Sequence, residues 1–568
     1  MSLEETKVRL LTASERADSL LAQVNDLYIL EIQTEKKFLN DALSELHNSG
    51  EIDLVEILGS LDKSSRGHDF FTILRVFEDV LPSLNSSVED VLNCLVHIDS
   101  GRAYGAFKRF CSVEVHRPRD SVEFILAQSE RNAYAPFLSS SILAYDSERV
   151  TEAIQTTESL ITNRNKMVRS QAYFILGRLD VGETQANVIW GLLSSSACNE
   201  RENGCCASIL RATLYFGATF PSYWSQIEQL LLTLIKVAHT EVLHEISDIV
   251  AFQRVDLPES VLCLLVKQLA HVSSEQNHTI SNINYVLVKL LETDSSLIAV
   301  ELLEAILVKG LEINELGYFS RELISNHQEL LNNIITKWFL SGVPSLCHSV
   351  LKLLHDVTDK DIELKAEMAL LDNGEKQIFV SHKAIGWLFT LPIAAASFII
   401  SIYEMASPIT CKDLENDLYS PLLLSYPGEL KRFLQSNLDE GIQEHLCARL
   451  LEKLRLYHSD IEKVSGLKEL MAPRENVSAY WKESNKEMEV AYEEASKTSI
   501  LSHIATTQSL LYGNSSIYYV HQVNGDKVRQ EMQMHTFSHS TEIPRLNVLD
   551  PESLDYTLRS YRSGSMKK

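Results

Sequence analysis

Apolar residues recur at every third or fourth position along most of the chain, which is the spacing of one face of an α-helix. Residues 68–83, 87–98 and 118–131 show this spacing clearly, and short polar breaks separate them. Over residues 52–372 apolar and polar residues do not alternate in the way that half-buried β-strands require. The pattern therefore predicts one helix after another across this span.

Two of the predicted helices carry related phrases about 40 residues apart. The phrases read VRSQAYFILGRL at residues 168–179 and SILRATLYFGAT at residues 208–219. In this alignment Ala172 matches Ala212, and Gly177 matches Gly217. A small residue and a glycine at matching places indicate helices that pack tightly against their neighbours.

A recurrence of this length is typical of solenoids in which each repeat is a pair of helices. On these phrases and their spacing, residues 60–370 resemble the HEAT-like or armadillo-like superfamily. The resemblance implies an elongated all-α scaffold and no particular chemistry. The proline, aspartate and arginine landmarks of HEAT repeats are not regular here, so a TPR or another array of helical pairs is the alternative.

Residues 384–403 form an uncharged stretch that is long enough to cross a bilayer as one helix. Pro392 lies near its centre, where it would interrupt a single helix but is well placed to begin a second one. A helix that is apolar on all sides is also found in the core of large proteins. We therefore expect two short buried helices and no membrane contact, with a transmembrane helix as the alternative.

A pattern near the C-terminus predicts β-structure. Residues 515–523 and 527–540 are rich in residues that favour strands, and Asn524-Gly525 lies between them. Asn-Gly suits the type I′ turn of a two-residue β-hairpin. A small β-hairpin is therefore expected, followed by a tail that ends on basic residues.

These patterns divide the chain into four predicted segments. They are an N-terminal helix or helix pair at residues 1–50, HEAT-like helical repeats at 51–372, a helical C-terminal domain with buried apolar helices at 373–510, and a β-hairpin module with a basic tail at 511–568. The predicted fold class is all-α: a HEAT-like helical-repeat solenoid with a helical C-terminal part and a small β-hairpin. The charged residues before the hairpin, 476–510, are expected to form a long helix.

The net charge limits the classes of partner that are expected, and the cysteine content indicates the cellular compartment. The net charge of −25, from 77 acidic and 52 basic residues, disfavours nucleic acid and anionic membrane surfaces, because both repel a polyanion. The nine cysteines include no Cys-x-x-Cys spacing, and most lie in apolar helical runs, as reduced buried thiols do. The N-terminus shows no signal-peptide pattern. An acidic, cytoplasmic protein is expected.

Polar residues of the C-terminal module form the first candidate site. The module differs in composition from the array before it, and a polar helix would cap an array more simply. We therefore predict that these residues dock a partner, with a catalytic or metal role as the alternative. They are Arg529, His535, His539, Glu542 and Arg545. His535 and His539 lie four positions apart and so on one face of a strand, but no zinc-ligand spacing is present.

A group of basic residues interrupts the acidic chain and forms the second candidate site. Its members are Arg102, Lys108, Arg109, Arg117 and Arg119, joined by Arg164 and Lys166 from a later inter-helix turn. If successive turns of the solenoid lie along one edge, these cations are expected to bind phosphate or an acidic partner. An ordinary solvated face is the alternative.

The sequence contains no motif of an enzyme, a nucleotide-binding loop or a metal centre. We therefore predict no cofactor, no metal and no catalytic residue. The favoured function is a non-enzymatic scaffold or adaptor that binds another protein, one with a basic surface, within a complex, because stacked helical pairs provide extended concave surfaces. The alternative is a subunit of a nucleic-acid-processing enzyme, or a nucleic-acid-binding protein, that uses the basic residues and the C-terminal module.

Overall fold

The computed structural model describes most of the chain up to residue 467. Within that part the residues that it does not describe are 1, 15–16, 35–36, 60–67, 99–102, 237–238, 253, 294 and 356–361. Beyond it the described residues are isolated positions between 474 and 489, three strands between 508 and 533, residues 542, 544 and 545, and residues 550–566. The chain divides into two compact units, Met1–Ile306 and Leu307–Lys568.

The described part of the first unit consists predominantly of α-helices. They are α1 (Leu3–Ala13), α2 (Ala17–Thr34), α3 (Leu39–Asn48), α4 (Leu54–Gly59), α5 (His68–Val80), α6 (Val88–Ile98), α7 (Ala103–Val113), α8 (Arg117–Ala127), α9 (Arg131–Tyr134), α10 (Phe137–Ile142), α11 (Val150–Ile161), α12 (Lys166–Leu176), α13 (Glu183–Asn199), α14 (Asn203–Thr219), α15 (Trp224–Leu234), α16 (Thr240–Ala251), α17 (Glu259–Leu269), α18 (Asn277–Leu291) and α19 (Ser296–Val308). Short 3-10 turns lie at Leu81–Ser83, Ser147–Arg149 and Pro221–Tyr223.

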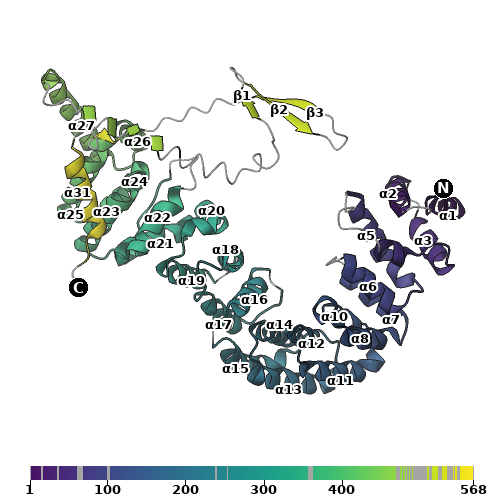
Figure 1. Ribbon diagram of the computed structural model, residues 1–568. Helices are drawn as coiled ribbons and strands as arrows, with labels where there is room; N and C mark the ends of the chain where they lie inside the picture. Colours follow the sequence, from purple (N-terminus) through teal and green to yellow (C-terminus); the bar gives the residue numbers. More distant parts are fainter. Residues whose placement is uncertain are drawn as a thin grey trace. The chain divides into compact units, whose positions relative to one another are not determined.

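From α11 onwards the helices of this unit alternate between two layers (Figure 1). The helices α12, α14, α16 and α18 pack side by side in one layer, called the inner layer because it lies on the inner side of the arc of this unit. The helices α11, α13 and α15 pack side by side in the other layer, and α11 contacts α12 as α13 contacts α14. Stacked helical pairs of this kind make a helical-repeat solenoid, so the predicted all-α repeat architecture is confirmed in this general form.

The two repeated phrases form α12 and α14, which are neighbours in the inner layer. Gly177 ends α12 so close to Ala212 that a Cβ atom at Gly177 would lie 2.6 Å from the Ala212 Cα. Gly217 on α14 faces the next outer helix, where a Cβ atom would lie 2.7 Å from side-chain atoms of Trp224 and Ile227. Both glycines are therefore close-packing positions, as the sequence predicts.

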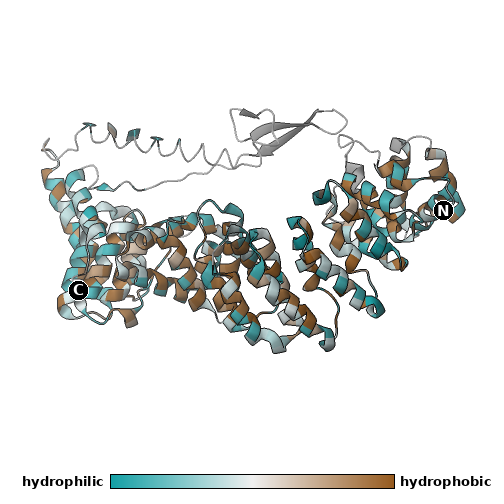
Figure 2. Cartoon of the chain, turned by 60° about the horizontal axis from the view of Figure 1, so that its bottom comes forward, coloured by the Kyte–Doolittle hydropathy of each residue, from teal (hydrophilic) through white to brown (hydrophobic). Residues whose placement is uncertain are grey.

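Hydrophobic side chains fill the space between the layers. Figure 2 shows hydrophobic and hydrophilic residues alternating around the helices, as expected for helices that each bury one face. On α14, for example, Ile209, Leu210 and Leu214 have no exposed surface. Burying one such side chain contributes about 1.5–3 kcal/mol, so a helix with three of them is held mainly by its packing.

The second unit is also predominantly helical. Its α-helices are α20 (Gly317–Asn326), α21 (Gln328–Ser341), α22 (Pro344–His355), α23 (Gly374–Leu388), α24 (Pro392–Tyr403), α25 (Pro408–Asp417), α26 (Pro427–Asp439), α27 (Glu444–Val464) and α31 (Pro551–Ser563), with short helical turns at Ile313–Leu316, Met368–Leu370 and Leu418–Leu423. The helix α23 contacts α21, α22, α24, α25 and α31, and it therefore lies at the centre of this unit.

The uncharged stretch at residues 384–403 is divided between α23 and α24. The helix α23 ends at Leu388, and Pro392 is the first residue of α24. On α24, Ala395, Phe398 and Ile399 have no exposed surface. The predicted pair of short buried helices is therefore confirmed. In the part of the chain that the structure describes, no helix has the length and apolar character that a membrane crossing requires.

Three strands lie near the C-terminus. They are β1 (Gln508–Leu510), β2 (Ser515–His521) and β3 (Lys527–Gln533), and they form an antiparallel sheet in the order β1-β2-β3. The strands β2 and β3 fall within the residues for which the sequence predicts a hairpin. Asn524 and Gly525 lie outside the described residues, so the type of turn stays a prediction. The helix expected up to residue 510 is wrong at its end, because β1 pairs with β2 through its backbone.

We predict that Gly177→Ala destabilises the first unit, because the added methyl group meets the backbone of α14 at Ala212. Overpacking of this kind costs about 1–3 kcal/mol. Gly191→Ala on α13 is the matched control, since no atom of a neighbouring element lies within 4 Å of its added Cβ and alanine favours a helix by about 1 kcal/mol. Urea denaturation should give a lower midpoint for Gly177→Ala alone. Equal midpoints for the two variants would contradict the close approach of α12 and α14.

Candidate partner-binding surface

Two of the residues predicted to dock a partner make contacts within the second unit. The Glu542 carboxylate accepts hydrogen bonds from the backbone N–H groups of Gly428 (2.8 Å) and Glu429 (2.7 Å), in the first turn of α26. A helix leaves these N–H groups unpaired and favours negative charge beside them, so Glu542 caps α26. The predicted docking role does not fit a carboxylate that is occupied in this way. Arg545 is exposed, and its Nη1 lies 3.3 Å from Nε2 of His458 on α27.

The other three residues of this candidate site are not gathered around Glu542 in the described structure. Arg529 lies on β3 as the register partner of Tyr519 on β2. His535 and His539 lie outside the described residues. A docking role for Arg529, His535 and His539 therefore stays a prediction.

Arg117, at the centre of the predicted anion site, is a buried structural residue with 4% of its surface exposed. Its guanidinium donates to the backbone carbonyls of Phe110 (3.1 Å) and Leu84 (3.2 Å) and pairs with Glu114 at 3.0 Å. Its Cζ atom also lies 3.9 Å from the centre of the Phe110 ring. These contacts join α8 to the elements before it, so the predicted anion-binding role does not fit Arg117.

The neighbouring cations of this candidate site are exposed, and two of them have partners within the first unit. Arg109 on α7 donates from Nη2 to the backbone carbonyl of Glu78 on α5 at 3.0 Å. Arg119 on α8 pairs with Glu123 one turn later at 2.8 Å. Lys108 is exposed on α7. Anion binding by these three residues stays a prediction.

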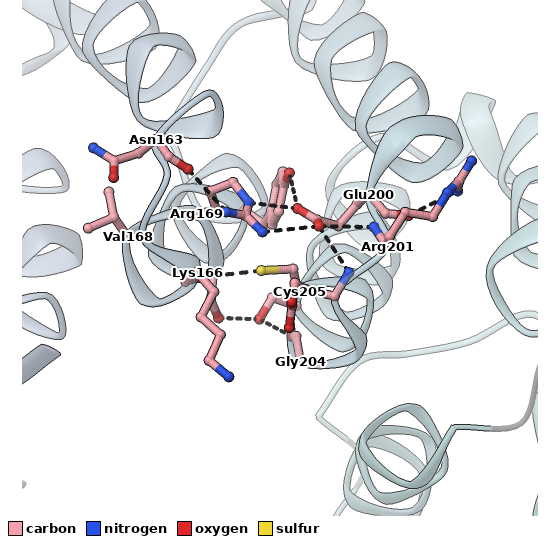
Figure 3. A network of polar contacts seen from close by, with 12 residues as sticks. Asn163, Lys166, Val168, Arg169, Glu200, Arg201, Gly204 and Cys205 are labelled. Atoms are coloured by element: carbon pink, nitrogen blue, oxygen red, sulfur yellow. Dashed lines mark hydrogen bonds and ion pairs between the residues drawn. The ribbon is translucent and has the colours of Figure 1, made fainter.

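Arg164 and Lys166 are exposed where the turn after α11 leads into α12. Their backbone carbonyls take part in local contacts. Arg164 O accepts from Arg169 at 3.2 Å. Lys166 O accepts from the Cys205 thiol at 3.4 Å (Figure 3). The side chains of Arg164 and Lys166 remain candidates for anion binding. Arg102 lies outside the described residues.

An ion pair beside this turn joins α12 to the residue that follows α13 (Figure 3). Arg169 donates from Nε and Nη2 to the two carboxylate oxygens of Glu200 at 2.9 and 3.2 Å, and from Nη1 to Asn163 O at 3.0 Å. The Glu200 carboxylate also accepts from the Tyr173 hydroxyl at 3.1 Å and from the two backbone N–H groups that follow it, at 3.0 and 3.1 Å. Only 17% of the Arg169 side chain and 7% of the Glu200 side chain are exposed.

The surroundings of Glu200 hold it in its charged form. Burial by itself would raise the pKa of this carboxyl, but the hydrogen bonds from Arg169, the two backbone N–H groups and Tyr173 outweigh burial and lower the pKa from 4.5 to about 2. Burial and the adjacent Glu200 charge raise the pKa of the Tyr173 hydroxyl well above its ordinary range. The ion pair between Arg169 and Glu200 therefore persists at neutral pH and links two successive repeats.

Similar polar contacts continue along the inner layer. Arg211 on α14 pairs with Glu245 and Asp248 on α16, and the contact from its Nη2 to Asp248 measures 3.0 Å. On the next pair of helices, Asn282 Nδ2 on α18 donates to Ser247 Oγ on α16 at 3.1 Å. These contacts hold α14, α16 and α18 in a defined register, and α12 is fixed by the Glu200 network.

Four aromatic side chains, called the aromatic stripe, follow the inner layer with one on each helix or at its end. They are Phe174 on α12, Tyr215 on α14, Phe252 directly after α16 and Tyr285 on α18. They come in two pairs. Arg178 lies between the first two, with its Cζ atom 3.9 Å from the Phe174 ring centre and 4.6 Å from the Tyr215 ring centre. The ring centres of Phe252 and Tyr285 are 6.0 Å apart, and Arg254 Cζ lies 5.3 Å from that of Phe252.

Aromatic and arginine side chains presented on packed helices are the residue types that carry most of the binding energy at protein interfaces. An aromatic pair adds about 0.5–1.5 kcal/mol beyond the area that it buries, and a cation–π contact adds about 0.5–2 kcal/mol. In the part of the chain that the structure describes, no group of histidine, cysteine, aspartate and glutamate side chains is arranged to hold a metal ion. The stripe consists of residue types that are common at protein interfaces.

The stripe was not predicted from the sequence. Phe174 and Tyr215 lie within the repeated phrases, where an aromatic residue at helical spacing indicates the core. Phe252 and Tyr285 have 48% and 47% of their surface exposed, and their own helices show no pattern that separates them from buried neighbours. The available signal was the recurrence of one aromatic residue per inner helix, at spacings near the repeat length.

Comparisons with known proteins assign no family to the chain. No family model matches it, and no curated protein matches it. Among solved structures it is similar to a circular tandem repeat protein with novel repeat topology and enhanced subunit contact surfaces, with 13% sequence identity, 87% of this chain and 96% of that chain covered, and a TM-score of 0.13. A likeness with so low a TM-score carries no argument, so the fold assignment rests on the helices themselves.

We predict that Glu200→Gln destabilises the first unit by about 3 kcal/mol, because it leaves the Arg169 guanidinium largely buried without its counter-charge. Stability should also depend on pH. Since the folded-state pKa lies below 4.5, the Glu200 contribution is present above about pH 4.5 and is lost as the pH falls towards 2. Urea denaturation at pH 7, 4 and 3 should therefore show a steeper acid loss for the wild type than for Glu200→Gln.

Glu123→Gln is the matched control for this variant. Glu123 pairs with Arg119 on the surface, with 63% and 68% of the two side chains exposed, and an exposed pair contributes at most about 1 kcal/mol. A loss as small in Glu200→Gln as in this control would show that the Glu200 network does not stabilise the packing of the repeats.

Proposed function

We propose that this protein is a non-enzymatic, HEAT-like helical-repeat scaffold that binds another protein along the inner layer of its first unit. The observation that carries the proposal is the pair Phe252 and Tyr285. Their rings lie on adjacent packed helices with centres 6.0 Å apart, and 48% and 47% of their surfaces are exposed. Fully burying an exposed large apolar side chain contributes roughly 1.5–3 kcal/mol, so covering these two half-exposed rings contributes about that much in total. The pair is therefore a suitable anchor for an interface.

The polar contacts beneath the stripe support its role as a binding surface. Arg211 with Glu245 and Asp248, and Asn282 with Ser247, fix the relative positions of α14, α16 and α18. Binding then requires little ordering of the backbone, which otherwise consumes part of the interaction energy. A preorganised surface of this kind favours a partner that binds either as a rigid folded domain or as an extended segment.

The charge of the chain favours a partner with a basic surface. A net charge of −25 attracts cationic segments at long range, and such attraction weakens as salt screens it. All nine cysteines are free thiols, which supports a reducing compartment such as the cytoplasm. We therefore place the proposed scaffold in a cytoplasmic complex with a basic protein.

Single-stranded nucleic acid is the competing ligand, because arginine and aromatic side chains also stack on bases. The overall negative charge opposes it, since phosphate contacts supply much of the affinity of nucleic-acid-binding proteins. An acidic surface therefore favours the protein partner, and nucleic acid becomes one outcome of the test below.

We predict that Phe252→Ala/Tyr285→Ala abolishes partner binding without unfolding the chain, because each ring is about half exposed before binding. Losing two anchors of this type costs about 2 kcal/mol each, which is more than a hundredfold in affinity together. The wild type, purified with its bound proteins from its own cells, should retain a stoichiometric protein that the double variant loses. Raising the salt concentration should release that protein from the wild type.

Leu232→Ala is the matched control. Leu232 lies on the outer helix α15 and has 58% of its surface exposed, so the variant removes exposed apolar surface from the opposite layer. Retention of the partner by the double variant would exclude the stripe as the binding surface. Nuclease-sensitive nucleic acid in place of a protein, seen as a raised ratio of absorbance at 260 and 280 nm, would support the competing ligand.

A further inference from the structure

The C-terminal helix α31 packs on α23 with very little apolar burial. Leu554 is the one buried residue among its 13. The rest of the helix is exposed or half-buried. A helix of this length in a protein core commonly buries a full apolar face, so hydrophobic packing contributes less to holding α31 than it does for a core helix. Several specific contacts, most of them polar, gather at its C-terminal end.

Lys383 on α23 caps the end of α31. Its side chain has no exposed surface, and its Nζ donates to the backbone carbonyls of Arg562 and Gly564, the latter at 2.7 Å. A helix leaves its last carbonyls unpaired and favours positive charge beside them. Burial disfavours the charged form of Lys383 and lowers its pKa. The two carbonyl acceptors offset the cost of burying this ammonium group, and that cost would return if α31 left.

A second set of contacts recognises the side chain of Tyr561. The rings of Tyr561 and His382 stack with centres 4.1 Å apart and planes 5° apart. The Tyr561 hydroxyl lies 3.4 Å from one oxygen of Asp417, whose other oxygen accepts from Ser381 Oγ at 3.1 Å and lies 3.4 Å from His382 Nε2. Asp417 is buried, with 8% of its surface exposed.

A third set of contacts joins Gly386 on α23 to Arg562 and Tyr561 at this end of α31. The Nε atom of Arg562 donates to the backbone carbonyl of Gly386. A Cβ atom at Gly386 would lie 3.1 Å from the Arg562 backbone nitrogen and 3.2 Å from the Tyr561 Cβ. The absence of a side chain at Gly386 therefore lets the last turn of α31 approach α23 closely.

We propose that the second unit contains a peptide-binding site, called the seat, which consists of His382, Lys383, Gly386 and Asp417. The seat binds the C-terminal end of a helix with the sequence Tyr-Arg-Ser-Gly. The helix α31 is its resident ligand and can be released. The seat binds two backbone carbonyls and one aromatic ring, and it contacts the helix backbone closely. These are features of a recognition site for a defined peptide. This site is separate from the inner layer of the first unit, and the proposal is independent of the proposed function.

The release of α31 follows from the balance of its contacts. One buried leucine offsets little of the conformational freedom that the 13 residues of α31 lose when they are ordered on α23. The polar contacts of the seat therefore supply a large share of the free energy that keeps α31 bound, while Glu542 holds the preceding residues on α26. While it is bound, the C-terminal residues are attached to the second unit at two places, through Glu542 on α26 and through α31 on α23.

The test uses full-length chains and a fluorescent synthetic peptide with the sequence of residues 550–566, followed by fluorescence anisotropy. Tyr561→Ala weakens the resident ligand and leaves the seat intact, so this chain should bind the peptide at least tenfold more tightly than the wild type does. Tyr561→Ala/Lys383→Met should lose that binding at least tenfold. Tyr561→Ala/Lys376→Met is the matched control and should keep it, because Lys376 lies at the other end of α23 and pairs with Asp372.

Hydrogen exchange on the full-length chain gives a second readout that does not need the peptide. Amides of α31 should exchange at least tenfold faster in Lys383→Met than in the wild type, with α24 unchanged, and at the wild-type rate in Lys376→Met. Peptide binding that is equal with and without Lys383 would overturn the proposal. It would also be overturned if no chain bound the peptide and α31 kept its wild-type protection in Lys383→Met, because α31 would then be a permanent part of the second unit.

Discussion

The close approach of successive inner helices is the constraint on which the architecture of the first unit depends. At Gly177 the end of α12 lies within backbone contact of Ala212 on α14, with no room for one further carbon atom. Because the helices are this close, Arg178 contacts the rings of Phe174 and Tyr215 on two different helices. A wider spacing would separate these groups. The proposed binding surface therefore depends on the same small residues that allow the helices to stack.

Polar contacts then set the register of helices that hydrophobic packing alone would leave free to slide. The hydrophobic burial of side chains such as Leu210 and Leu214 has no directional preference. The bidentate contact between Arg169 and Glu200, by contrast, requires one relative orientation of the two side chains. A charge that is largely buried and loses its partner is costly. In a solenoid each repeat contacts only its neighbours, so one such contact per junction is enough to define the register along the layer.

The second unit uses distant residues for the capping that most helices obtain from their immediate neighbours. Glu542 satisfies the first N–H groups of α26, and Lys383 satisfies the last carbonyls of α31. Both contacts place a charge at the helix end that the helix dipole favours. The C-terminal residues are thus attached through a few charged contacts, and the apolar core of this unit is formed by helices such as α23 and α24.

The sequence by itself determined the helical class, the tight packing at Gly177 and Gly217, and the break between two buried helices at Pro392. These features depend on local physics: the period of apolar residues, the size of a side chain and the missing N–H group of proline. Only the tertiary structure determined which residues of the candidate sites are exposed and which are buried. Arg117 is basic and looks available in the sequence, yet it lies buried among Phe110, Leu84 and Glu114, while Phe252 and Tyr285 look like core residues and are exposed. Which side of a helix meets its neighbour, and which distant residue reaches a helix end, is set by contacts between residues far apart in the chain, and no local pattern records them.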